Sequence, residues 1–475
     1  MKGLTDIKAD FSGWYNELVQ KAELADHAPV RGCMVIRPYG YALWERMQQF
    51  MDARIKATGH QNAYFPLFLP TDLLAKEAGH IEGFNAEGVR VTKIGGKELD
   101  KDGELVVRFS SEAIIMEMFS KWVQSHRDLP LMVNQWCNVV RWELRPRLFL
   151  RTSEFLWQEG HTAHATEAEA RTETMTMLHV YRDFMEQHLA ISPYTGRKTE
   201  KEKFAGAEET YTCEGLMGDG KALQMGTSHF FGQRFARAFG IKFQSTGGTQ
   251  EFAWTTSWGS STRMIGAVIM AHGDAKGLVL PPEIAPYQVV IVPILKSDSD
   301  SSQVLAEAHA IKAALSSLRV YVDDRDQYKP GHKFNEWELK GVPLRIELGA
   351  RDLAARQVVI ADRRTGEKTT IARDALPETL PRLLREFQQA LLDANRKLRD
   401  TSTRAAATLD ELTALVEGPG GFVRVPWCGM TRCEDRIKEA CKATARCIVP
   451  DAQPEGPCLF CSMKADKVVL FARAY

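Results

Sequence analysis

Two arginines and several aromatic residues lie close together between residues 141 and 161. Arg141 begins Arg-Trp-Glu, and after a short polar segment the chain continues over 149–161 as FLRTSEFLWQEGH. Guanidinium groups bind phosphate oxygens through paired hydrogen bonds, so Arg141 and Arg151 on neighbouring strands can converge on a triphosphate, with Phe155 stacked on its base. The alternative from the residues alone is a ladder of arginine–glutamate ion pairs across an ordinary sheet.

A cluster of cysteines near the C-terminus is a second group of candidate functional residues. Six of the chain's nine cysteines lie there, and two short spacings among them are typical of a structural four-thiolate zinc site. If residues 434–441 form a helix, Cys441 lies about 12 Å along its axis from Cys433, which is too far for both to bind one zinc ion. Cys447 stays open as a ligand, and free buried cysteines are the alternative. The predicted zinc ligands are Cys428, Cys433, Cys458 and Cys461.

A third stretch, residues 328–345, mixes basic, acidic and aromatic side chains. Such a surface can stack unpaired RNA bases and read their edges. The alternative is a solvated helix face that carries a buried tryptophan.

The composition allows two to four globular domains in 475 residues, with 44% hydrophobic and 26% charged residues. Lys+Arg and Asp+Glu both number 61, so any nucleic-acid contact must come from a local basic patch rather than from the total charge. The first eight residues carry charges at positions where a signal peptide would be apolar. The longest aliphatic stretches, such as Ile265–Ala271, are too short to span a bilayer. We expect a cytoplasmic protein.

The first half of the chain must position the arginines. Apolar spacing predicts a helix over 39–56, and a capping-box pattern opens another over 166–189. Alternation and aromatic content predict extended segments or antiparallel strands over 64–70, 132–136, 138–142 and 148–151, and hairpins within 85–107.

After Pro281-Pro282 the pattern changes to a βαβα rhythm. The apolar run 288–294 predicts a strand buried on both faces, and 320–322 a second strand. A long helix over 377–399 leads to a joint at 401–403.

The stretch from Arg141 to His161 resembles motif 2 of class II aminoacyl-tRNA synthetases, in the form typical of prolyl-tRNA synthetases. Trp258–Arg263 is similar to motif 3, and the helix and strand that end at Pro66 are similar to motif 1, which builds the dimer interface of that class. Residues 224–229 resemble the family's loop between motifs 2 and 3, and 108–112, RFSSE, its proline-binding loop. The resemblance covers essentially the whole chain.

This resemblance implies an α+β protein. A class II antiparallel sheet flanked by helices would occupy residues 1–283, an α/β anticodon-binding domain 284–400, and a small zinc-containing α+β domain 401–475. It implies ATP-dependent activation of L-proline to prolyl-adenylate, with release of pyrophosphate, and then transfer of proline to the 3′ end of tRNA(Pro). It also implies Mg²⁺ with ATP, structural Zn²⁺ and a homodimer.

The family's roles are carried over one residue at a time. Arg141 would hold the proline carboxylate and the α-phosphate of ATP, and Arg263 would cover adenine and reach the γ-phosphate; these two are the catalytic candidates. The remaining candidates for ATP are Glu143, Arg151, Thr152, Phe155, Gln224, Thr227 and Ser261. Those for proline, besides Arg141, are Ser110, Glu112, Trp157, Glu159, His161, Phe204 and His229.

Several features depart from the family's usual pattern or mark one branch of it. Phe109-Ser110 replaces Pro-Thr; serine keeps the hydroxyl but loses a methyl, so we expect weaker proline binding or poorer discrimination. Residues 207–214 lack the family's threonine-rich run, which leaves contacts there open.

The segment between His161 and Gln224 is too short for an editing insertion, so we expect no internal removal of misloaded alanine. The terminal Tyr475 resembles that of the archaeal and eukaryotic-like branch, in which it points towards the active site.

The chemistry needs no general base, because the proline carboxylate is already ionised at neutral pH. Positioning and charge neutralisation around phosphorus suffice. We expect some activation of cysteine and alanine, since an apolar pocket separates analogues by only about 1–3 kcal/mol per methylene. The rivals are another class II synthetase and a synthetase-like regulator, for which a clamp of Arg141, Arg151 and Arg263 would have no use.

Overall fold

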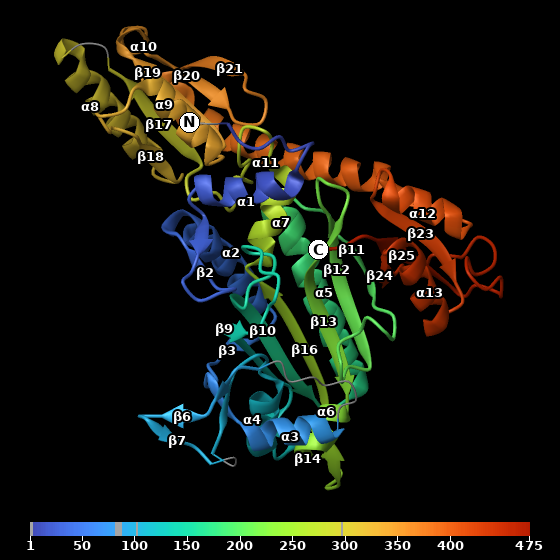
Figure 1. The fold of residues 1–475 in the computed structure, drawn as a ribbon. Coiled ribbons are helices and arrows are strands. Elements are labelled where there is room, and N and C mark those ends of the chain that lie inside the picture. The colour runs from blue at the N-terminus through green and yellow to red at the C-terminus, as the bar shows by residue number, and fades with distance from the viewer. Residues whose placement is uncertain (1–2, 81–87, 101–102, 296–297) are drawn as a thin grey trace.

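The computed structural model describes residues 3–80, 88–100, 103–295 and 298–475. Figure 1 shows a long twisted sheet in the middle, a second unit with its own sheet above it, and a C-terminal unit at one side of the central sheet. The expected α+β architecture is confirmed. Among the described residues, none of the helices is long and apolar enough to cross a membrane.

The central sheet has the order β22-β23-β25-β24-β11-β12-β13-β16-β10-β9-β3. Antiparallel pairs join its middle strands, β12 (Glu209–Leu216), β13 (Ala222–Gly232), β16 (Trp254–Ser261), β10 (Glu154–His164) and β9 (Leu131–Val140). The segments expected as two strands over 132–142 are therefore one strand, β9. At its edge, β3 (Gln61–Asn62) pairs parallel to β9.

The register between β10 and β16 explains why residue 160, within the motif predicted from the sequence, is a glycine. Gly160 on β10 lies opposite Trp258 on β16. A Cβ atom on Gly160 would lie 1.9 Å from the fully buried ring of Trp258. Only glycine fits there, because packed interiors leave no room for such an overlap.

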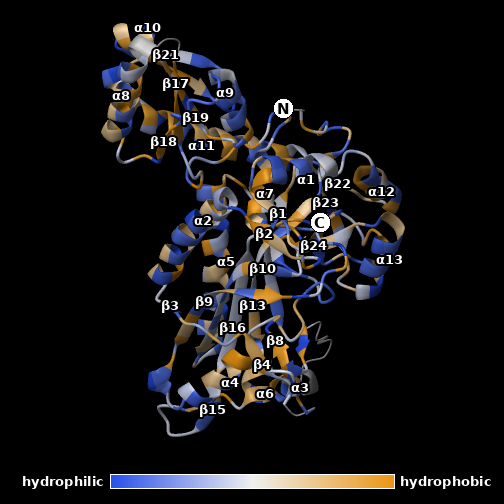
Figure 2. Cartoon of the chain, turned by 60° about the vertical axis from the view of Figure 1, so that its left-hand side comes forward, coloured by the Kyte–Doolittle hydropathy of each residue, from blue (hydrophilic) through white to orange (hydrophobic). Residues whose placement is uncertain are grey.

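Helices cover the sheet and close its core. Helix α5 (Glu167–Leu189) packs along β13 and β16, and Thr166 and Glu169 form the predicted capping box at its start. α2 (Pro38–Ala57) packs against α5, while α1 (Phe11–Lys21) and α7 (Arg263–His272) contribute to the same core. Almost all of α7 is apolar and buried (Figure 2).

The strand predicted over 148–151 is wrong. Leu148, Phe149 and Leu150 form a turn, with Phe149 at φ 62°, and β10 begins only at Glu154. All three are buried in the main core, and the carbonyl of Leu148 accepts a hydrogen bond from Tyr15. Their apolar character reflects burial of a loop rather than sheet pairing.

A smaller layer lies at the far end of the central sheet, below it in Figure 1. It contains the sheet β4-β8-β5 and the helices α3 (Thr71–His80), α4 (Glu112–Trp122) and α6 (Arg234–Phe239). Its strands are β4 (Phe68–Pro70), β8 (Leu105–Val107) and β5 (Arg90–Val91). Of the expected hairpins, β6 (Lys93–Ile94) and β7 (Lys97–Glu98) form one, whereas residues 85–87 and 101–102 lie outside the described residues.

The second unit is a five-stranded mixed sheet. The predicted buried strand, β17 (Val289–Ile294), pairs parallel with β18 (Val320–Val322) and β19 (Leu344–Gly349). Strands β20 (Gln357–Asp362) and β21 (Lys368–Ala372) continue it antiparallel. Helices α8 (Asp298–Ala314) and α9 (Pro330–Leu339) pack on it, and Trp337 of α9 is buried.

The C-terminal unit follows the long helix α11 (Leu376–Thr401). Its strands are β22 (Thr403–Ala405), β23 (Phe422–Trp427), β24 (Thr444–Ile448) and β25 (Lys467–Ala472), and its helices are α12 (Leu409–Glu417) and α13 (Thr431–Cys441). β24 meets β11 (Tyr194–Arg197) at one pair, Ile448 opposite Arg197. The unit thereby extends the central sheet.

Candidate active site

A hollow of about 310 Å³ lies on the face of the central sheet. Side chains from β10, β13 and β16, from the loop after β9 and from the start of α4 surround it. Its predicted members are Glu112, Arg141, Phe155, Trp157, Glu159, Phe204, Gln224, Thr227, His229, Ser261 and Arg263.

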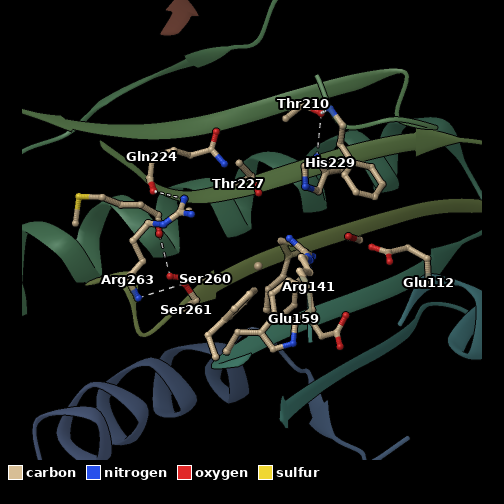
Figure 3. Close-up of a pocket in the computed structure, with 18 of the residues that line it drawn as sticks. Glu112, Arg141, Glu159, Thr210, Gln224, Thr227, His229, Ser260, Ser261 and Arg263 are labelled. Carbon is tan, nitrogen blue, oxygen red and sulfur yellow. Dashed lines mark hydrogen bonds between the residues drawn. The ribbon is translucent and has the colours of Figure 1, made fainter. Parts of the chain in front are cut away.

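The hollow has two chemically different ends (Figure 3). Arg263 and Gln224 lie at one end, Glu112 and His229 at the other, and Arg141 between them. Arg141 is held by its Nε, which donates to the carbonyl of Phe109 at 2.9 Å. A ligand that fills this hollow therefore contacts cations at one end and a carboxylate at the other.

Cations crowd the first end. Arg263 donates from Nε to the carbonyl of Leu150 at 3.2 Å and from Nη1 to that of Gln224 at 3.4 Å. Burial, and then the neighbouring guanidinium groups of Arg151 and Arg141, lower the pKa of Arg263 to about 10. Three guanidinium groups this close favour an anion between them.

The second end holds a buried acidic network. Glu159 accepts hydrogen bonds from Ser111, from Gln135 at 2.8 Å and from His161 at 3.0 Å. Burial alone would raise the pKa of Glu159, but these donors, His161 first, lower it below the ordinary value. Glu112 is also buried, and its Oε2 has no hydrogen-bond partner among the described residues.

The wall beside this end is mostly uncharged. The rings of Phe204 and His229 lie 4.8 Å apart, and Nδ1 of His229 is 2.9 Å from Oγ1 of Thr210. Burial, and then the nearby His161, lower the pKa of His229 to about 3. His229 is therefore neutral at physiological pH.

Five predicted residues lie outside the wall of the hollow. Ser110 and His161 are buried and do not line it, and His161 is linked to it through its hydrogen bond with Glu159. Thr152 donates to the carbonyl of Glu154, and Glu143 accepts from the backbone of Arg145. The fifth, Arg151, lines a second hollow.

The sequence did not single out eight residues that line the hollow. Five of them lie inside the stretches 224–229 and 258–263 that resemble family motifs, so those stretches were the signal, whereas Glu202 lies in a loop without any signal. Thr210 falls in the stretch whose contacts were left open. The residues are Glu202, Thr210, Met225, Gly226, Ser257, Trp258, Gly259 and Ser260.

The four cysteines of the predicted zinc site lie together at the tip of the C-terminal unit, with all sulfur atoms within 4.8 Å of one another. The Sγ of Cys428 lies 3.7 Å from those of Cys433 and Cys461. Tetrahedral zinc–thiolate bonds place sulfurs about 3.8 Å apart, whereas a disulfide would need about 2 Å. Cys441 and Cys447 are outside this group; Cys441 donates to the carbonyl of Ile437.

Three family models match this chain. That described as "tRNA synthetase class II core domain (G, H, P, S and T)" covers residues 96–272. "Anticodon binding domain" covers 288–383, and "Prolyl-tRNA synthetase, C-terminal" covers 409–475.

Curated relatives and a solved structure match over nearly the full length. The proline–tRNA ligase of Natranaerobius thermophilus is 50% identical, covering 100% of this chain and 98% of that protein. That of Chloroherpeton thalassium is 51% identical, covering 99% of each. The crystal structure of prolyl-tRNA synthetase from Cryptosporidium parvum, complexed with halofuginone and AMPPNP, is 40% identical, with a TM-score of 0.94, and covers 100% of this chain and 99% of that one.

Proposed function

The chain belongs to the prolyl-tRNA synthetases, class II enzymes that ligate proline to tRNA, and from this we propose which of its side chains serve each part of the reaction. The observation that carries the proposal is the position of Arg141, between a cationic end and a carboxylate end of one hollow. In prolyl-adenylate, the α-phosphate is joined to the proline carboxylate, with the adenine base on one side and the proline amine on the other. The order of charges in the hollow matches this arrangement.

Proline would occupy the acidic end. The nearest ligand atoms of Glu112, Glu159 and His161 lie within 4.8 Å of one another, close enough for a single cation. The ring ammonium of proline is such a cation, and it would satisfy the orphaned oxygen of Glu112. Trp157, Phe204 and the neutral His229 would surround the ring without repelling its charge, with Ser110 and His161 supporting the pocket from behind.

ATP would occupy the cationic end. Arg141 would bridge the proline carboxylate and the α-phosphate, and Arg263 would face the remaining phosphates and the base. The other nucleotide residues would be Glu143, Arg151, Thr152, Phe155, Gln224, Thr227 and Ser261. Mg²⁺ bound to the phosphates of ATP would supply charge neutralisation there, which would not require a cage of protein carboxylates.

Exchange of pyrophosphate into ATP with each of the twenty amino acids tests this assignment. We expect proline to dominate and cysteine and alanine to trail by about 10- to 200-fold, because a tight apolar pocket discriminates by only a few kcal/mol. A preference for a larger or acidic amino acid would contradict the placement of proline between Glu112 and Trp157. Binding of both ligands without exchange would favour a regulator.

We propose that Cys428, Cys433, Cys458 and Cys461 hold one structural zinc ion. Their 3.7 Å sulfur separations support this, and four thiolates leave no open position for chemistry. The ion would fasten the loop of Cys458 and Cys461 to the start of α13.

Replacing the fully buried Cys433 with serine is expected to remove essentially all zinc from the purified enzyme, because three thiolates bind it far more weakly. The measurement is the zinc content per chain by atomic emission. Cys441→Ser is the matched control, since its hydroxyl keeps the bond to Ile437 and lies outside the cluster. Loss of zinc in the control, or full zinc in Cys433→Ser, would refute the ligand set.

We propose the division 1–283, 284–400 and 401–475 for the catalytic, anticodon-binding and zinc-binding domains; the matched ranges 288–383 and 409–475 support the second and third. The substrates are ATP, L-proline and tRNA, and for the tRNA we propose tRNA(Pro). We further propose a homodimer that works in the cytoplasm. The exposed rings of Tyr64, within the segment similar to motif 1, and of Phe68, just after it, support the dimer.

A further inference from the structure

A second hollow, of about 460 Å³, lies where the C-terminal unit meets the central sheet. The turn before β10 forms one side of it, and the end of α13 with the start of β24 forms the other. Its charged members are Arg145, Arg147, Arg151, Glu202, Lys438, Lys442 and Arg446.

The charge of this hollow is unbalanced. Six cationic side chains face one acidic side chain, Glu202, in a chain whose formal net charge is zero. Two of the six are committed elsewhere: Arg446 pairs with Glu214, and Arg147 lies over the rings of Tyr15 and Tyr475.

The other four cations are Arg145, Arg151, Lys438 and Lys442, and none of them makes an ion pair within the part of the chain that the structure describes. Because Arg151 is among the residues proposed for ATP, Arg145, Lys438 and Lys442 are left for another anion. Like charges gathered in one concave surface raise the local potential and attract a polyanion.

The hollow adjoins the ATP end of the active site. Glu202 lines both hollows. Leu150 lines the second one, and its carbonyl accepts the hydrogen bond from Arg263 of the first. A polyanion in the second hollow would therefore lie directly beside the adenylate.

We propose that this hollow binds the phosphates of the unpaired 3′ end of tRNA, and that Lys438 and Lys442 of the C-terminal unit are its sequence-independent contacts. The proposal rests on the function proposed above, because the transfer step requires the 3′ end to reach the adenylate. It gives the zinc-binding unit a role in the reaction: it carries two cations to the active-site entrance, at a place fixed by the buried pair Arg446–Glu214.

The test is the double variant Lys438→Ala/Lys442→Ala. Both side chains are exposed, so the change should leave the fold intact. We expect the Kd of tRNA(Pro) to rise about tenfold near physiological salt, and the slope of log Kd against log salt to fall by about 1.4, for two single-strand phosphate contacts. Pyrophosphate exchange with proline, which needs no tRNA, should be unchanged.

Two controls locate the effect. Arg432→Ala/Lys464→Ala removes the same charge from exposed positions of the same unit outside the hollow, and should bind tRNA like the parent enzyme. A tRNA without its unpaired 3′ end should bind the parent enzyme and the Lys438/Lys442 variant equally well. Lys438→Arg/Lys442→Arg should keep parental affinity.

Unchanged tRNA affinity and salt slope in the alanine variant would overturn the inference. So would a higher KM for pyrophosphate with normal tRNA binding, because the hollow would then hold the leaving group. Absence of proline-dependent exchange in the parent enzyme would instead refute the proposed function, so the two failures are distinguishable.

Discussion

Replacing Arg141 with alanine is expected to lower kcat/KM for proline activation by about 10³-fold, as loss of a preorganised transition-state donor does elsewhere. Arg141 is fixed before substrates arrive: its Nε bonds to Phe109, and the rings of Phe155 and Trp157 lie 5.6 and 5.3 Å from its guanidinium carbon. It would serve both reacting groups, the carboxylate that attacks and the phosphate that is attacked.

Steady-state pyrophosphate exchange, with proline and ATP varied separately, is the measurement. Arg141→Lys keeps the charge but loses the planar fork, so it should recover only part of the rate. Arg127→Ala, an exposed arginine outside the hollow, is the matched control. A decrease below tenfold in Arg141→Ala would show that the bridge between carboxylate and phosphate lies elsewhere.

The second large effect concerns stability. Arg446→Met is expected to lower the free energy of unfolding by about 2–3 kcal/mol, because it removes one of the two cations that pair with a buried carboxylate and leaves the other in place. Glu214 is fully buried; Arg446 donates to its Oε2 at 2.7 Å, and Lys198 to its Oε1 at 2.8 Å. Since Arg446 belongs to β24 and Glu214 to β12, the loss should loosen the C-terminal unit from the central sheet.

The same pair predicts a pH dependence. Burial would raise the pKa of Glu214, but Lys198 and Arg446 lower it below 4.5. The stabilisation is therefore complete above pH 4.5, the ordinary glutamate pKa, and is lost as the pH falls through the lower folded pKa. Denaturant unfolding from pH 7 to 3 should show a shallower acid loss in Glu214→Gln than in the parent.

A matched control for both measurements is Arg436→Met, an exposed residue paired with Glu439 at the surface, which should cost less than about 1 kcal/mol. Equal costs for Arg436→Met and Arg446→Met would mean that the buried pair does not fasten the two units.

The sequence alone predicted the family, most of the elements and the group of four cysteines that the structure brings together. These features are local or nearly so: the capping box of α5, the uninterrupted apolar run of β17, and short cysteine spacings. Short-range patterns depend on backbone geometry and hydrogen bonding within a few residues, which sequence spacing reports directly.

The tertiary structure determined which residues face one another across strands and between units. Leu148–Leu150 has the apolar and aromatic character of a strand yet forms a buried turn, since burial rather than pairing selects its apolar residues. Thr210, Glu202 and Ser257 enter the active-site wall only through register and loop placement, which no single stretch encodes. The second hollow forms only because folding brings α13 against the turn before β10. Charges distant in sequence add to one local potential only when the fold places them together.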